Sequence, residues 1–227
     1  MTTSREAIPV IGASANRLWG GGSMSTRRSL LAAAILVLPV VRSRRAVAAD
    51  SSTPVTTISS FYDVLLSVMK EGPSLGFNGR RERLAPAVHR TFDLPLMTRL
   101  MVGPQWVGLT AAQQQQLVAA FSDFSVATYA NRFDDFSGER FQVAPDTTPS
   151  PEGAIVTTRL IKSDGDAVQI DYLMREGDGS WQIIDVYLSG TVSELATRRS
   201  EFSSVLRRGG PDALVDLLQK KTIQLRG

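Results

Sequence analysis

Cysteine is absent from this chain of 227 residues, and histidine occurs only once, at His89. Without cysteine the protein has no disulfide, no thiol nucleophile and no thiolate ligand for a metal. A Ser-His-Asp triad or a histidine-rich metal site would have to be built around His89. Asp93 is the only ligand-type residue at helical spacing from His89, and this pair leaves a metal site underfilled. We therefore expect no metal and no cofactor.

A hydrophobic run long enough to cross a bilayer is also absent, since the apolar stretch at residues 30–41 is too short to do so. It follows Arg27 and Arg28 and precedes small residues at 46–49, an order typical of a signal peptide. We predict that residues 1–48 are an export leader that is removed, with Met24 a candidate for the true start. The arginine pair leaves both the twin-arginine and the general secretory route open.

The positive charge of the chain comes from the predicted leader. Residues 1–48 carry seven arginines and one acidic side chain, so residues 49–227 keep 18 basic and 21 acidic groups. The net charge thus changes from +3 to −3 when the leader is removed. A mature domain of this charge has no strong electrostatic attraction for phosphate backbones, and we expect no nucleic-acid partner. Residues 49–227 have the length of a single domain with one sizeable core.

Apolar residues at helical spacing predict that the first half of the mature chain is helical. A first helix ends near residues 72–73, and a second helical region at 80–90 is interrupted at Pro86. Asp93 is placed to cap a third helix, which residues 103–104 stop. Thr110 and Gln113 form a capping-box pattern at the start of the longest helix.

From residue 139 the apolar period changes to two, which predicts strands. The strong runs are residues 154–161, 168–174 and 181–188, and residues 141–144 form a weaker first strand. Gly-rich turns between the runs favour hairpins. We predict an α+β fold with about four antiparallel strands in a curved sheet, wrapped by N- and C-terminal helices.

The predicted strands are apolar on both faces, so the sheet needs cover on both sides or a cavity on one. Tyr172 lies on one apolar stripe, and Trp181, Ile183 and Tyr187 are assigned to another. We predict an apolar pocket between the sheet and the helices, while plain core packing is the competing interpretation. Trp106, after a Gly-Pro pair, is placed on a loop at the pocket mouth. The candidate ligand-binding residues are Phe61, Tyr62, Leu65, Leu100, Trp106, Phe121, Phe124, Ile170, Tyr172, Tyr187 and Arg199.

From residue 56 to residue 218 the chain resembles the toluene-tolerance, or MlaC-like, family of periplasmic phospholipid-binding proteins, an auxiliary component of ABC transporters. The resemblance lies in the order and spacing of several short motifs, of which none is decisive alone. These are Phe92-Asp93 with Met97, Gly103-x-x-Trp106, Thr110-x-x-Gln113 with Phe121, Tyr129-Ala130, Trp181-x-x-x-Asp185-Val186 with Gly190, and Ser193, Arg199, Phe202 and Leu214.

The resemblance implies a non-enzymatic carrier that crosses the periplasm with a lipid held between sheet and helices. Its expected partners are the lipid, an inner-membrane transporter complex and outer-membrane lipoprotein components, with transient membrane contact. One departure is Arg198-Arg199 where the family has a Tyr-Arg pair, with one extra residue after Gly190. Residues 193–202 are more similar to the branch associated with hopanoid biosynthesis, which shifts the expected cargo from a phospholipid toward a hopanoid.

Three alternatives remain open at the level of sequence. Arg198 or Arg199 falls on an apolar stripe, and a pair with Asp185 is favoured over a lipid-headgroup clamp. A cone-shaped α+β fold could hold an isomerase or dehydratase with an aspartate base such as Asp171 or Asp185 and tyrosine donors. A protein-binding envelope adaptor with a filled core is the third possibility.

Overall fold

A computed structural model describes residues 52–226 of the chain, and the predicted leader at residues 1–48 lies outside the described residues. Five α-helices, one 3-10 helix and five strands make up this part. In chain order they are α1 (Pro54–Lys70), α2 (Gly72–Thr91), α3 (Leu94–Val102), η1 (Gly103–Gly108), α4 (Ala111–Arg132), β1 (Arg140–Ser150), β2 (Gly153–Ile161), β3 (Ala167–Gly177), β4 (Ser180–Leu188), β5 (Val192–Ser193) and α5 (Glu194–Gln224).

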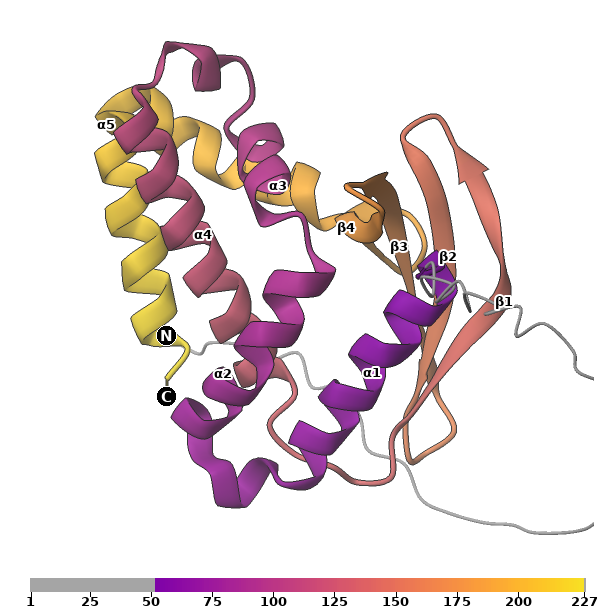
Figure 1. The fold of residues 1–227 in the computed structure, drawn as a ribbon. Coiled ribbons are helices and arrows are strands. Elements are labelled where there is room, and N and C mark those ends of the chain that lie inside the picture. The colour runs from indigo at the N-terminus through magenta and orange to yellow at the C-terminus, as the bar shows by residue number, and fades with distance from the viewer. Residues whose placement is uncertain (1–51, 227) are drawn as a thin grey trace, which may run out of the picture.

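The strands form one antiparallel meander in the order β1-β2-β3-β4-β5. Figure 1 shows the helices on one side of this curved sheet, with α1 running along it and α4 and the second half of α5 farther away. Register shifts interrupt the pairing of β1 with β2 and of β3 with β4. Such bulges bend a sheet and increase its twist. The predicted α+β class is therefore confirmed, with a fifth, two-residue strand that the sequence did not reveal.

The helix starts follow the capping patterns in the sequence. The Asp93 side chain accepts a hydrogen bond from the backbone of Leu96, three residues into the turn it caps. Thr110 and Gln113 make both bonds of a capping box, with N···O distances of 3.0 and 3.3 Å. These side chains satisfy backbone donors that the first turn leaves free. Both predicted caps are confirmed.

The helix interruption predicted at Pro86 is wrong, and two helices bend at glycines instead. Pro86 does not interrupt α2, whose only non-helical backbone is at Gly76. The non-helical residue of α5 is Gly210, just before Pro211, so α5 consists of two helical halves. Glycine adopts the required positive φ without a Cβ penalty, which explains why the chain turns there. The halves of α5 come together again through an ion pair between Lys221 and Glu201 at 2.6 Å.

We predict that Gly153→Ala lowers the free energy of unfolding. Gly153 has a φ of 150°, and a Cβ there would lie 2.1 Å from the Met174 carbonyl oxygen. The β1–β2 hairpin would have to shift away from β3, at a cost of about 3 kcal/mol. Urea denaturation measures the loss. Gly177→Ala, at a glycine with no atom within 4 Å of the added Cβ, is the matched control. Equal stability of the two variants would contradict the prediction.

Candidate functional site

Seven aromatic side chains form one connected network between α1, the joint of α2 with α3, the end of α4 and the sheet. Neighbouring ring centroids are 4.0 to 6.2 Å apart, as in stacked and edge-to-face pairs. The network therefore lies in the region where the sequence predicts an apolar pocket. Its members are Phe61, Tyr62, Phe92, Tyr129, Phe133, Phe141 and Tyr172.

A chain of hydroxyl groups runs through this apolar interior. The Tyr62 hydroxyl lies 2.6 Å from Thr158 Oγ1 and 3.0 Å from the Tyr172 hydroxyl, and Thr158 donates to the Ile170 carbonyl. All three side chains are at least 97% buried. Burial raises the pKa of Tyr62 to about 12 and the pKa of Tyr172 well above its usual value. These hydrogen bonds join α1 directly to β2 and β3.

Most of the predicted ligand-binding residues lie in the same buried core. Phe61, Tyr62, Leu65, Phe121, Phe124, Ile170 and Tyr172 are all members of it. Trp106 packs against the core from η1 and is half-buried. Leu100 lies on α3 outside this core and is 40% exposed.

The period of the sequence assigns Tyr187 to the wrong face of the sheet, because β4 contains a bulge. Met174 pairs with Ile183, but the next residue of β3, Leu173, pairs with Asp185, which leaves Ile184 as an extra residue in β4. The alternation of faces therefore reverses after Ile183. Tyr187 pairs with Asp171 and lies on the face of the sheet opposite Tyr172.

Asp185 does not pair with an arginine, which corrects the favoured role of Arg198 and Arg199. Its carboxylate instead accepts hydrogen bonds from the backbone of Val186 and Leu195 and from the Ser193 hydroxyl, at 2.7, 3.0 and 2.5 Å. It thus fastens the start of α5 to β4, where a helix N-terminus favours a negative charge.

The two arginines have different surroundings. Arg198 forms ion pairs with Glu194 and Glu201 at 3.5 and 3.2 Å, and its guanidinium lies over the Phe124 ring. Arg199, in contrast, is exposed and faces Gly103. No described carboxylate lies within 4 Å of Arg199.

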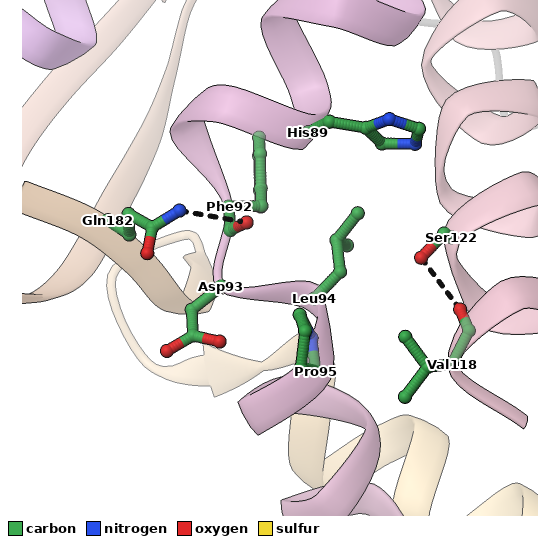
Figure 2. Close-up of a pocket in the computed structure, with 8 residues that line it drawn as sticks. All are labelled: His89, Phe92, Asp93, Leu94, Pro95, Val118, Ser122 and Gln182. Carbon is green, nitrogen blue, oxygen red and sulfur yellow. Dashed lines mark hydrogen bonds between the residues drawn. The ribbon is translucent and has the colours of Figure 1, made fainter. Parts of the chain in front are cut away.

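A hollow of about 310 Å³ lies where α2, α3, α4 and β4 meet, and Figure 2 shows the side chains around it. His89 and Asp93 face it, but Asp93 already caps α3 and pairs with Arg175 at 3.3 Å. Ser122 and Gln182 are also committed, to the carbonyls of Val118 and Phe92. Across residues 52–226, no three acidic or histidine side chains gather as metal ligands.

A second hollow, of about 420 Å³, lies between the end of α3, η1 and the first half of α5. Arg199 is the only predicted ligand-binding residue that lines either hollow. The other predicted residues pack on one another or lie elsewhere on the surface. No described helix is long and apolar enough to cross a membrane.

The fold and interior define a class of protein in which an antiparallel meander is covered on one side by helices and closed by aromatic side chains. The MlaC protein family model matches residues 59–220, which run from α1 into α5, so the chain belongs to the MlaC family. This family consists of lipid-binding carriers rather than enzymes. No curated protein matches the sequence.

Among solved structures, the chain is similar to a phospholipid-binding protein from Ralstonia solanacearum, whose structure contains a phospholipid. The TM-score is 0.67 with 22% sequence identity, over 78% of this chain and all of the other. This likeness confirms the fold.

We predict that Asp185→Ala lowers the free energy of unfolding by about 2 to 3 kcal/mol, because it leaves the buried backbone donor of Val186 and the half-buried donor of Leu195 without an acceptor. Denaturant titration measures the change. Asp216→Ala, at an exposed position on α5, should change stability by less than about 0.5 kcal/mol. Arg199→Gln should be equally neutral. A marked loss of stability with Arg199→Gln would support the hypothesis that Arg199 pairs with Asp185.

The hydroxyl chain makes stability depend on alkaline pH. Folding raises the pKa of Tyr62 from 10.0 to about 12, so the folded state favours the neutral phenol. This contribution is complete below pH 10 and is lost as the pH rises toward 12. We expect the melting temperature to fall over this range, and to fall less in Tyr62→Phe. At neutral pH Tyr62→Phe should cost about 1 to 2 kcal/mol. An identical alkaline decline in both proteins would contradict this assignment.

Proposed function

We propose that this protein is a periplasmic carrier that shuttles a lipid between the inner and outer membranes. Residues 1–48 serve as its export leader, and residues 49–227 form one lipid-binding domain. The observation that carries the proposal is membership of the MlaC family together with an interior of packed aromatic rings. The solved protein of the same fold holds a phospholipid, which supports a lipid as cargo here.

The apolar part of the cargo lies between α1 and the sheet, among Phe61, Tyr62 and Tyr172. Burying each methylene there is worth about 0.8 kcal/mol, which supplies the affinity that a carrier needs in water. Since the Tyr62 ring contacts Phe141 and Tyr172 of the sheet, cargo binding selects a form in which α1 has moved away from the sheet. The bonds of Tyr62 are the polar contacts that this movement breaks.

Among lipids, the cargo is a hopanoid or another polycyclic lipid. The support is the similarity of residues 193–202 to the hopanoid-associated branch. The partners are an inner-membrane transporter complex, which is the usual setting of an ABC auxiliary component, and outer-membrane lipoprotein components. The isomerase hypothesis is not retained, because the chain belongs to a family of lipid-binding carriers and Asp185 is committed to three hydrogen bonds.

Native mass spectrometry with lipid extraction tests this function on protein recovered from its own cell envelope. We expect one lipid per protein chain, with a mass that separates a two-chain phospholipid from a hopanoid. Protein that is repeatedly free of lipid would overturn the carrier function and favour an adaptor with a filled core. A phospholipid mass would keep the carrier and exclude the hopanoid.

A lipid with a photoactivatable group in its tail tests where the cargo lies. We expect crosslinks in the peptides that contain Phe61 and Tyr62 of α1 and Tyr172 of β3. The region around His89 serves as an internal control, because its hollow is open to solvent in the closed form. Crosslinks confined to that region or to η1 would show that the cargo lies outside the aromatic interior.

A further inference from the structure

The hollow between the end of α3, η1 and α5 is lined on one side by a single helical face. Its α5 residues recur at helical spacing and combine two arginines with small side chains. The turn of η1 forms the other side and lies at the end of the molecule away from β1 and β2 (Figure 1). The lining residues are Val102, Pro104, Gln105, Ala196, Arg199, Ser200, Ser203 and Arg207.

The two arginines of this hollow have no carboxylate partner among the described residues. Within residues 52–226, no carboxylate lies within 4 Å of Arg199 or Arg207. The acidic neighbours on α5, Glu194 and Glu201, are held by Arg198 and Lys221. Arg199 and Arg207 therefore line the hollow without forming an ion pair with a described carboxylate.

A glycine leaves the space that Arg199 occupies. A Cβ at Gly103, where φ is 69°, would lie only 3.2 Å from the Arg199 Nη2 atom. The same residue ends α3 and begins η1. The chain therefore turns at the point where the guanidinium approaches its backbone.

The surrounding sequence is free of negative charge over an unusually long stretch. Residues 94–122, which include α3 and η1, contain no aspartate or glutamate, and neither do residues 202–211 of α5. Residues 49–227 as a whole have a net charge of −3, so this surface is a local positive region on an acidic domain. Such a region attracts anionic surfaces without making the whole protein cationic.

An apolar tip stands beside the positive region. Val107 in η1 is 84% exposed, and Leu100 on the preceding helix is 40% exposed. They are two of only four large hydrophobic side chains exposed among the described residues. Apolar residues that enter the headgroup layer, next to basic residues that bind lipid phosphates, are the physical requirements for interfacial membrane binding.

We propose that the surface formed by η1 and the first half of α5 docks on an anionic membrane, with Val107 entering the interface and Arg199 and Arg207 binding lipid phosphates. The guanidinium fork suits a phosphate, and the exposed apolar tip favours a bilayer over an acidic protein. This docking surface is distinct from the cargo interior. The docking proposal uses the proposed carrier function for one point only, which is that the partner is a membrane.

Vesicle flotation tests the docking surface with protein recovered from its own envelope. We expect binding to vesicles that contain phosphatidylglycerol and little binding to pure phosphatidylcholine. Arg199→Gln with Arg207→Gln should weaken binding by about 30-fold, from the interaction of two basic residues with an anionic surface. Val107→Ser should also weaken it. Raising the salt concentration should release the protein, because the screening length falls from about 10 Å at 0.1 M to about 3 Å at 1 M.

Arg140→Gln with Arg159→Gln is the matched control, since it removes the same charge from two exposed residues of the sheet. This variant should bind as the unaltered protein does, apart from a small effect of net charge. Equal losses in the two double variants would overturn the proposal, as would equal binding to neutral vesicles. Absence of binding to both kinds of vesicle would also overturn it and favour an acidic protein as the partner.

The cargo measurement keeps this result separate from the carrier function. The Arg199→Gln, Arg207→Gln variant should retain its lipid in native mass spectrometry while it loses vesicle binding. Loss of cargo together with docking would contradict a separate docking surface. Unaltered protein that docks on anionic vesicles but never carries a lipid would refute the carrier function and leave the docking surface in place.

Discussion

The contact of α1 with the sheet is the interaction on which the rest of this structure depends. Tyr62 stacks on Phe141 of β1 and hydrogen-bonds toward β2 and β3, so one side chain connects the helix to three strands. A buried phenol without a partner is costly, so these contacts hold α1 against the sheet. A lipid that enters between α1 and the sheet must replace both the ring contacts and the hydroxyl partners.

The fold was predictable to the extent that its signals are local. Asp93, Thr110 and Gln113 cap their helices because a side chain and a backbone amide three residues apart are enough to decide a helix start. Pro86 shows the opposite case, because α2 continues through it with Leu84, Ala87 and Val88 buried in the core. The strands were found by their period of two, but the short β5 was not, since two residues carry no period.

The site was predicted less well because it depends on register. The alternation of apolar residues in β4 placed Ile183 and Tyr187 together, but the extra residue at Ile184 puts them on opposite faces. That bulge also turns Asp185 toward the start of α5, where it accepts a hydrogen bond from the Leu195 backbone instead of pairing with Arg199. Nothing in a single sequence distinguishes a bulged strand from a regular one, because the extra residue is itself apolar.

The buried core and the hollow beside η1 share the first half of α5. Phe202 and Leu206 enter the core, while Arg199, Ser203 and Arg207 lie on the neighbouring face of the same helix. A helix transmits a displacement of one face to the other, because its backbone hydrogen bonds leave it stiff between its ends. Gly210 bounds this half of α5 on one side, and Asp185 fastens the other end to β4. A displacement of the arginine face would therefore also move Phe202 and Leu206 within the core.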